Sequence, residues 1–330
     1  MTGANGFIGR HLVEALQGTG RTVRVLVRSA DRAEGLPAGV DVRIGDVTRP
    51  LGLPEAVTGV GTVYHVAGRI RGRRADSFRP VNEEGTRSLV LACRKSAPDL
   101  DRFLLVSSMA ATGPVRRGEG RPVRESDRPR PVSEYGRSKR AGEEAAFEAA
   151  AGAFPVTVVR PPVVYGPRDT GVLNFYRFAD RGFRPKFTRE KYYSIVHVND
   201  LVRGMILAAG EPRAAGRIYH LANDSAPSFT RLFELIASHV GKSLRPLPLP
   251  TPLLPLIAAV LDLLSGSFGM DARPLSDKVR EVMADLWVMD TSRARRELGF
   301  RTEVSLEDGF AETARSYREL GWLPTPASRV

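Results

Sequence analysis

The stretch Thr2-Gly3-Ala4-Asn5-Gly6-Phe7-Ile8-Gly9 stands directly behind Met1 in a chain of 330 residues. Three glycines at this spacing let a backbone turn tightly, approach a pyrophosphate and begin a helix that packs closely on a sheet. Apolar residues at helical spacing continue to Leu16, and Gly18 and Gly20 end the pattern. We therefore predict a dinucleotide-binding turn whose cofactor contacts come from Gly3, Asn5, Gly6, Phe7, Ile8 and Gly9.

The β-strand that normally leads into such a turn is missing, since only Met1 precedes Thr2. In a doubly wound sheet this strand is central and has neighbours on both sides. Without it, two inner edges of the sheet would have unpaired backbone groups. We therefore expect that Met1 is a misassigned start and that about four to six residues rich in Val, Ile or Leu precede it.

Strand-like and helical patterns alternate through the first half of the chain. Strands are predicted at residues 22–27, 40–44, 62–66, 103–106 and 156–159, and helices notably around 81–94 and 134–150. This alternation indicates an α/β fold of Rossmann type, a doubly wound parallel sheet with helices on both faces. Beyond residue 160 the segments shorten and Pro and Gly are frequent. We therefore assign residues 1–160 to a dinucleotide-binding domain and residues 161–330 mainly to a smaller substrate-binding lobe, some of whose segments return to the sheet.

Composition excludes several classes of protein. The net charge of +12 comes mostly from arginines scattered among acids, and the run Arg69-Ile-Arg-Gly-Arg-Arg74 has no interleaved aromatics, so no nucleic-acid partner is predicted. The uncharged stretch 246–261 is short and contains five prolines, which argues against a transmembrane span and leaves an apolar lid or a peripheral membrane contact open. The lone Cys93 excludes an internal disulfide and fits a cytoplasmic protein. We predict no metal site.

Three polar residues further along the chain predict chemistry. In Tyr135-Gly-Arg-Ser-Lys139 the tyrosine and the lysine are four residues apart and share a helix face. A free tyrosine has a pKa of roughly 10, so Tyr135 needs a nearby cation such as Lys139 to exchange a proton near neutral pH. Ser108 follows a predicted strand, at the sheet edge where ligands bind, and its hydroxyl can hold a substrate oxygen against Tyr135. Together with the glycine turn, these residues predict an enzyme that uses a nicotinamide cofactor.

With these motifs the chain resembles the extended branch of the short-chain dehydrogenase/reductase superfamily, also called the NAD-dependent epimerase/dehydratase family. The resemblance covers essentially the whole chain and rests on Gly45-Asp46-Val47, Tyr64-His-Val-Ala-Gly68, Asn82-Glu-Glu-Gly-Thr86, Ser107-Ser108, Arg160-Pro-Pro-Val-Val-Tyr-Gly-Pro167 and His197-Val-Asn-Asp200, besides the two motifs above. It implies that Ser108, Tyr135 and Lys139 are catalytic and that Lys139 also holds the nicotinamide ribose. It implies further cofactor contacts from Asp46, Val47, Val66, Ala67, Gly68 and Pro161.

Departures from the family pattern distinguish between activities. Met109-Ala110 follows Ser108, where sugar 4,6-dehydratases have Asp-Glu. Val163 and Tyr193 stand where nucleotide-sugar epimerases usually carry the Asn and Arg that contact the substrate. The chain is therefore most similar to 3β-hydroxysteroid dehydrogenases and dihydroflavonol-type reductases, which implies hydride transfer with a largely apolar small molecule. Two alternatives stay open, an epimerase with tightly bound NAD and a redox regulator that binds cofactor without turnover.

Three further predictions concern cofactor choice, the second lobe and assembly. Strand 22–27 ends at Arg28, where NAD-preferring domains place an acid, so we predict NADP(H) over NAD(H), with Arg32 as a second contact to the 2′-phosphate. We expect a structural role for His197, and we expect Asp200 to cap a helix over 201–209.

Many relatives dimerise through the helices around 81–94 and 134–150. A homodimer is therefore expected, although packing within one chain is an equal alternative for Leu89, Cys93, Ala141, Ala145 and Ala149.

Overall fold

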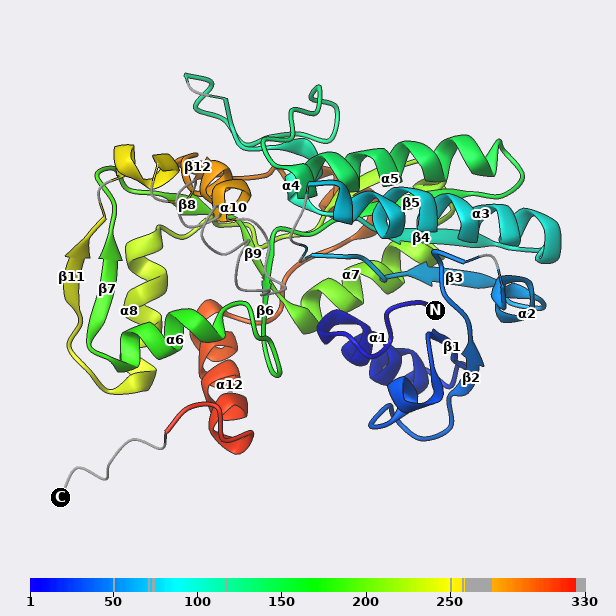
Figure 1. Ribbon diagram of the computed structural model, residues 1–330, viewed down its shortest axis with the longest axis horizontal. Helices are drawn as coiled ribbons and strands as arrows, with labels where there is room; N and C mark the ends of the chain where they lie inside the picture. Colours follow the sequence, from blue (N-terminus) through cyan, green and yellow to red (C-terminus); the bar gives the residue numbers. More distant parts are fainter. Residues whose placement is uncertain are drawn as a thin grey trace.

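The computed structural model describes residues 1–49, 51–70, 72, 75–116, 118–249, 251–256, 258 and 275–324. Two lobes lie side by side (Figure 1). One contains a parallel sheet between two layers of helices, and the other is built of helices and short strand pairs. The α/β fold of Rossmann type predicted from the sequence is confirmed.

The sheet of the first lobe is parallel and falls into two parts. β3 (Thr62–His65), β4 (Arg102–Val106), β5 (Val156–Arg160) and β10 (Ile218–His220) are hydrogen-bonded in the order β10-β5-β4-β3. β1 (Arg24–Val27) and β2 (Asp41–Ile44) form a separate pair. Single bridges from Thr2 to Leu26 and to His65 join the two parts. The spatial order is therefore β2-β1-Thr2-β3-β4-β5-β10, that of a doubly wound sheet.

The central strand is thus represented by two residues rather than being entirely absent, as the sequence had suggested. Leu26 N–H donates to the Met1 carbonyl oxygen at 2.9 Å, and Thr2 N–H donates to the Tyr64 carbonyl oxygen at 3.0 Å. The amino group of Met1 donates to the Arg24 carbonyl oxygen. Met1 and Thr2 therefore occupy the end of the strand position that leads into the glycine turn.

Helices cover both faces of this sheet. α1 (Phe7–Gly18) and α7 (Val198–Gly210) pack together on one face, and α2 (Leu53–Val57), α3 (Gly85–Ser96) and α5 (Glu134–Ala150) pack on the other (Figure 1). A π-helical turn, Pro80–Glu84, leads into α3. Every residue of β4 and β5 is buried, because parallel strands covered on both faces have no solvent side.

The second lobe is built around α6 (Leu173–Asp180), α8 (Phe229–Val240) and α12 (Leu306–Glu319), which share an aromatic-rich core. Its other elements are β6 (Val163–Tyr165) paired with β9 (Ile195–His197), β7 (Phe183–Lys186) with β11 (Arg245–Pro248), β8 (Tyr192–Tyr193) with β12 (Leu286–Trp287), and the helix α10 (Leu275–Val282). The helix α11 (Ser292–Leu298) packs against α7 and β10 of the first lobe. Short helical turns are Ala30–Ala33, Ala75–Phe78, α4 (Met109–Thr112), Pro212–Ala214 and Thr251–Leu253. The uncharged stretch 246–261 thus begins in a strand, and its residues 250, 257 and 259–261 lie outside the described part of the chain.

The prediction that Asp200 caps a helix over 201–209 is wrong. The helix, α7, begins at Val198, and His197 Nδ1 accepts the N–H of Asn199 at 3.4 Å as its cap. Asp200 lies in the first turn and accepts the N–H groups of Glu303 and Val304 at 2.9 and 3.1 Å. Its carboxylate therefore ties the segment before α12 to α7. His197 is fully buried, and burial lowers its pKa to about 4, so it is a neutral structural residue at pH 7.

Four of the residues considered for a dimer interface are buried within one chain. Leu89, Cys93, Ala145 and Ala149 are at most 5% exposed, at or near the contact between α3 and α5. Burial raises the pKa of the Cys93 thiol to about 12, which fits packing and not nucleophilic chemistry. These four side chains do not form a surface for a partner, and the homodimer itself stays a prediction. Among the residues that the structure describes, no helix combines the length and apolar character needed to cross a membrane.

Candidate active site

Two close backbone approaches fix the glycine turn. Gly3 has a φ of +73°, which L side chains rarely adopt, and a Cβ there would lie 2.6 Å from the Ala67 nitrogen. A Cβ on Gly9 would lie 2.0 Å from the Gly3 carbonyl oxygen, which accepts the N–H of Gly6 at 3.0 Å. The first turn of α1 has neither a side-chain cap nor an acidic residue. Its N–H groups therefore fit the pyrophosphate of a dinucleotide.

A chain of buried polar groups joins this turn to the neighbouring strand and helix. Thr2 Oγ1 accepts the N–H of Ala67 at 3.1 Å and lies 2.7 Å from His65 Nδ1. His65 Nε2 lies 3.0 Å from Thr86 Oγ1, which donates to the Asn82 carbonyl oxygen at 2.8 Å. Burial lowers the pKa of His65 to about 3, so the ring is neutral and mediates hydrogen bonds rather than charge. The chain positions the predicted cofactor-lining residues Val66, Ala67 and Gly68 at the end of β3.

Lys139 is a buried cation at the carboxyl edge of the sheet. Its ammonium group donates to the Val106 carbonyl oxygen at 2.6 Å, and the side chain is 7% exposed. Burial lowers the lysine pKa from 10.5 to about 8, although the carboxylate of Glu143 acts in the opposite direction. A Cβ on Gly68 would lie 3.3 Å from Lys139 Nζ. Because glycine has no side chain, there is room beside the Lys139 ammonium group for a ribose hydroxyl.

The start of α5 brings Tyr135 close to the turn that carries Ser108. Ser108 Oγ accepts the N–H of Ala110 at 3.1 Å and so caps α4. A Cβ on Gly136 would lie 2.3 Å from the Ala110 carbonyl oxygen, so the two backbones touch. Tyr135 precedes Gly136 on α5, and its half-buried ring lies edge-on to Phe78 at 6.0 Å. Thus the structure places Ser108, Tyr135 and Lys139 around the same edge of the sheet.

Asn82 is a positioning residue to which no separate role could be assigned from the motif Asn82-Glu-Glu-Gly-Thr86 alone. Its amide nitrogen donates to Ser138 Oγ at 2.9 Å and to the Arg69 carbonyl oxygen at 3.0 Å, while its amide oxygen accepts the Arg69 N–H at 2.7 Å. Ser138 Oγ in turn donates to the Tyr135 carbonyl oxygen at 2.7 Å. Asn82 therefore holds the segment after Gly68 against the first turn of α5. The π-helical turn that carries it has no sequence signature that we recognised.

A buried ion pair between Glu143 of α5 and Arg160 of β5 fixes α5 against the sheet. The guanidinium of Arg160 and the carboxylate of Glu143, both fully buried, form two hydrogen bonds of 2.6 and 2.8 Å. Ser107 Oγ also donates to Glu143 at 2.5 Å, and Arg160 donates to Thr112 Oγ1 at 2.9 Å. These contacts connect α5 to β4, β5 and α4. The only sequence signals were an arginine in an otherwise apolar strand and a glutamate four residues beyond Lys139.

The remaining predicted cofactor residues line the rim of the first lobe. Arg28 follows β1, is exposed, and makes no hydrogen bond or ion pair with any described residue. Asp46 follows β2 and accepts the N–H and the hydroxyl of Thr48 at 2.9 Å each. Val47 is buried, and a Cβ on Gly85 would lie 2.8 Å from its Cγ2, so it also packs against α3. The Pro161 carbonyl oxygen accepts the Met109 N–H at 2.8 Å and fixes α4 against the end of β5.

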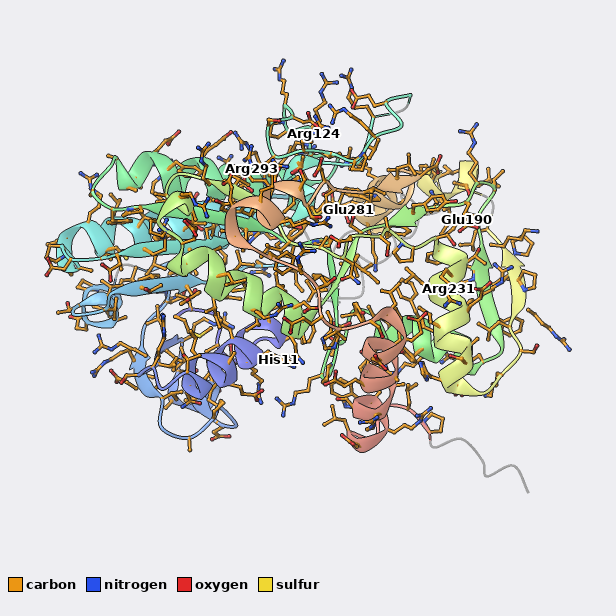
Figure 2. The ribbon with its side chains drawn as sticks, turned by 180° about the vertical axis from the view of Figure 1, so that it is seen from behind. His11, Arg124, Glu190, Arg231, Glu281 and Arg293 are labelled. Carbon is orange, nitrogen blue, oxygen red and sulfur yellow. The ribbon has the colours of Figure 1, made fainter. Side chains whose placement is uncertain are left out.

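A cavity of about 840 Å³ lies beyond the start of α5 and receives residues from both lobes. Ser133 Oγ, at the N-terminus of α5, donates to Glu281 at 2.7 Å, and Figure 2 shows Glu281 between the two lobes. Val132, three residues before Tyr135, lines the cavity. Its other walls carry the apolar side chains of Val115, Phe187, Met283 and Leu286 and the charged side chains of Arg116, Arg130, Arg189, Lys191 and Asp285. Lys191 Nζ donates to Asp285 at 2.9 Å. Ser108, Tyr135 and Lys139 are not among the residues that line this cavity.

Comparisons with known proteins agree with this geometry. A family model described as the NAD-dependent epimerase/dehydratase family matches residues 1–222. The chain is 32% identical to a ceramide reductase of Caulobacter vibrioides, over 98% of this chain and 95% of that protein. It is 26% identical to a UDP-glucose 4-epimerase of Vibrio cholerae, over 96% and 94% of the two chains. The solved UDP-glucose 4-epimerase of Thermotoga maritima shares the fold, with a TM-score of 0.78 at 22% identity over 97% of this chain and 98% of that one.

Proposed function

Because the chain belongs to the NAD-dependent epimerase/dehydratase family, we propose that it catalyses reversible hydride transfer between a nicotinamide cofactor and a secondary alcohol or ketone of a largely apolar small molecule. The observation that carries the proposal is the buried Lys139 ammonium group, fixed on the Val106 carbonyl at 2.6 Å, one helical turn beyond Tyr135. A cation held without a carboxylate in direct contact is available to stabilise a neighbouring phenolate.

In the reduction direction, the bound cofactor supplies the hydride. Tyr135 donates its hydroxyl proton to the carbonyl oxygen of the substrate, and Ser108 Oγ donates a hydrogen bond to the same oxygen. Lys139 stabilises the tyrosinate that remains, and a buried charge does this more effectively than an exposed one. In the oxidation direction the tyrosinate accepts the alcohol proton.

Two observations favour an apolar ketone over a nucleotide sugar. Val163 is 46% exposed at the start of β6, and Tyr193 packs against Phe229, so neither position offers a charged group to a diphosphate. The relative named ceramide reductase, at 32% identity, supports a lipid-like substrate. The epimerase relative at 26% identity keeps a nucleotide sugar as the second candidate.

The test of the reaction compares cofactor oxidation with sugar epimerisation in one preparation. We expect NADPH consumption with long-chain ketones, no interconversion of UDP-glucose and UDP-galactose, and a loss of kcat in Tyr135→Phe on the order of 100-fold or more. The cofactor Kd should change little in this variant, because the hydroxyl acts on the substrate. The matched control is Tyr192→Phe, since Tyr192 is an exposed tyrosine of the second lobe.

Other outcomes point to the alternatives. Purification with stoichiometric NAD and turnover of UDP-sugars would identify an epimerase. A protein that binds cofactor tightly but turns over neither class of compound, and whose cellular role survives Tyr135→Phe, would be a redox regulator.

We further propose that the cofactor is NADP(H). Arg28 is an exposed cation at the end of β1, free of described partners, at the position where NAD-preferring domains carry an acid. Arg28→Ala should weaken NADP(H) binding by roughly 10-fold or more, the value of a charge-assisted contact to phosphate, and leave NAD(H) binding unchanged. Isothermal titration with both cofactors measures this, with Arg177→Ala on α6 as a control. Equal affinities for the two cofactors in the parent protein would contradict the proposal.

A further inference from the structure

The cavity of about 840 Å³ that receives residues from both lobes has more basic than acidic side chains on its walls. Among the described residues that line it, four are cations and one is an acid, namely Arg116, Arg130, Arg189 and Lys191, and Asp285. Lys191, whose side chain is 1% exposed, already neutralises the acid, because its ammonium group donates to Asp285 at 2.9 Å. Arg116 is bound to Glu119 at 3.0 Å. Two arginines are therefore left without a close carboxylate.

These two arginines come from different lobes. Arg130 lies between α4 and α5 of the first lobe, and its side chain forms no hydrogen bond or ion pair with any described residue. Its backbone is fixed, because its N–H donates to the Thr112 carbonyl oxygen at 2.7 Å and a Cβ on Gly113 would lie 2.2 Å from its own carbonyl oxygen. Arg189 lies between β7 and β8 of the second lobe, 3.9 Å from Asp285. An anion that enters the cavity thus meets cations from both lobes.

The rest of the cavity wall is largely apolar. Its apolar side chains are Val115, Val132, Phe187, Met283 and Leu286. Val132 and Ala284, which both line the cavity, also pack on the apolar cluster that contains Met109, the residue after Ser108. An occupant therefore needs an apolar chain, which this wall removes from water, and an acid group, which the arginines bind through charge-assisted hydrogen bonds.

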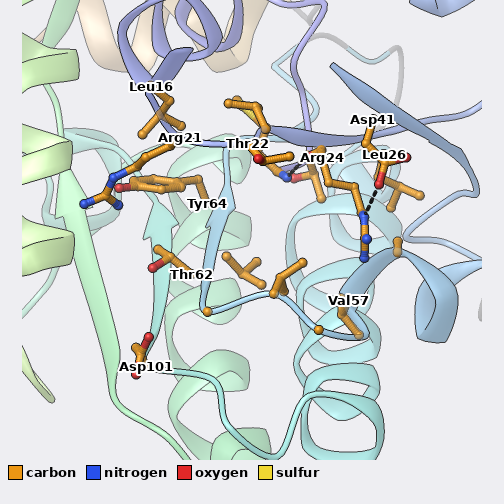
Figure 3. A pocket seen from close by; sticks show the side chains of 18 of the residues that line it. Leu16, Arg21, Thr22, Arg24, Leu26, Asp41, Val57, Thr62, Tyr64 and Asp101 are labelled. Carbon is orange, nitrogen blue, oxygen red and sulfur yellow. Dashed lines mark hydrogen bonds and ion pairs between the residues drawn. The ribbon is translucent and has the colours of Figure 1, made fainter. Parts of the chain in front are cut away.

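The excess of positive charge is not a general result of the arginine-rich composition. The cavity of about 450 Å³ between β1 and β3, shown in Figure 3, has balanced charges. The charged side chains among its described lining residues are Arg21, Arg24, Asp41 and Asp101. Arg24 Nε donates to Asp41 at 2.6 Å, as the dashed line in Figure 3 marks. The cavity between the lobes differs in that two of its cations have no such partner.

We propose that the cavity between the lobes binds the acidic end of an amphipathic molecule. A phosphate or carboxylate group is held by Arg130 and Arg189, and the apolar chain attached to it packs along Val132 and Phe187. The inference rests on the proposed function in one respect, which is that the amphipathic molecule is the ketone substrate itself.

The lining of the cavity also says which part of the substrate it holds. Ser108, Tyr135 and Lys139 do not line it, so the acid group is held at the end of the substrate remote from the reacting carbonyl. Val163 and Tyr193 stand where nucleotide-sugar epimerases carry the residues that contact the substrate, and neither lines the cavity. The acid site therefore differs from the diphosphate site of those enzymes.

The first test measures binding without turnover. The full chain is titrated calorimetrically, in the presence of NADP(H), with octyl phosphate, octanoate, octanol and inorganic phosphate. The better of the two acidic amphiphiles should bind at least ~10-fold more tightly than octanol and than inorganic phosphate, because chain and acid group both contribute. Arg130→Ala and Arg189→Ala should each weaken this binding by roughly 10-fold. Arg315→Ala, at an exposed position of α12 that does not line the cavity, is the matched control.

The second test links the cavity to the substrate. It compares a methyl ketone of medium chain length with the keto acid of the same length, in which the far methyl group is replaced by a carboxylate. The keto acid should have a kcat/KM at least ~10-fold higher, mainly through a lower KM, and Arg130→Ala should remove most of this preference. Arg315→Ala should keep it.

Two results would overturn the proposal. One is binding of both acidic amphiphiles that is no tighter than that of octanol, or that neither arginine variant weakens. The other is equal kcat/KM for the ketone and the keto acid in the parent protein. Failure of the proposed function looks different, since arginine-dependent binding of octyl phosphate together with no reduction of either ketone would contradict hydride transfer and leave the acid site in place.

Discussion

At the scale of single residues, the site depends on how burial changes the charge of Lys139. Its ammonium group lies at the carboxyl edge of the sheet, bonded to the Val106 carbonyl, and has a pKa of about 8 rather than 10.5. The nearest acid, Glu143, is held in two hydrogen bonds by Arg160 and in a third by Ser107. No described carboxylate binds Lys139 directly, so its positive charge is only weakly neutralised. We therefore expect this charge to stabilise a tyrosinate and to be lost as the pH rises.

The pH dependence of ketone reduction should report this lysine. Lys139 carries its charge below about pH 8 and loses it as the pH rises, so kcat/KM should fall on the alkaline side with an apparent pKa of about 8. Lys139→Arg keeps a charge over the whole range, and the alkaline fall should move above pH 10 in this variant. An unchanged fall near pH 8 in Lys139→Arg would mean that another group titrates, since macroscopic values belong to the whole site.

At the scale of helices and strands, the site is assembled by close contact between α5 and the π-helical turn before α3. A Cβ on Gly142 would lie 2.1 Å from the Asn82 carbonyl oxygen, so only glycine allows this approach. The contact brings Asn82 within reach of Ser138 and sets the first turn of α5 against the segment after Gly68. The geometry of Tyr135 and Lys139 is therefore a property of two packed elements and not of one motif.

Gly142→Ala should disturb both stability and the site. The added methyl group must push α5 away from a rigid backbone, which costs about 1–3 kcal/mol, and the Asn82–Ser138 hydrogen bond should lengthen. We expect a lower Tm together with weaker cofactor binding and lower kcat. Gly210→Ala is the matched control, because a Cβ at Gly210, at the end of α7, meets no atom within 4 Å. Equal behaviour of the two variants would show that the close contact does not position the site.

Patterns that are local in sequence could be predicted, and contacts between distant residues could not. The glycine turn, α1 and the bounds of α5 followed from spacing and composition, and the five predicted sheet strands were located to within two residues, whereas β10 was not predicted. Asp200 was misread because its partners, the backbone groups of Glu303 and Val304, lie about a hundred residues away. The hydrogen bonds of Asn82 were also missed, because their partners Arg69 and Ser138 lie 13 and 56 residues away in the sequence. The bond between Glu143 and Arg160 was not anticipated because an isolated arginine in an apolar strand does not identify its partner.

At the scale of the whole molecule, the first lobe is a sheet in two parts. Among the described residues, the backbone links between the β1–β2 pair and the four-stranded part are made by Met1 and Thr2. β2 is half-exposed or exposed along its whole length, whereas β4 and β5 are buried. Few buried contacts and exposed hydrogen bonds favour local opening. The predicted cofactor contacts lie on both parts, with Arg28 on one and Gly68 and Lys139 on the other.

We therefore predict that the two parts of the sheet differ in stability and that the cofactor links them. In the free 330-residue protein, amides of β1 and β2 should exchange at least ~10-fold faster than those of β4 and β5. Since the predicted cofactor contacts lie on both parts, saturating NADP(H) should favour the joined arrangement and slow exchange in β1 and β2 more than in β4 and β5. Hydrogen exchange followed by mass spectrometry measures both effects. The Arg28→Ala variant, which still forms both parts, should show the fast exchange of β1 and β2 even with NADP(H) present at the concentration that protects the parent. Uniform exchange across β1, β2, β4 and β5 in the free protein would mean that α1 and α7 alone make the sheet one cooperative unit.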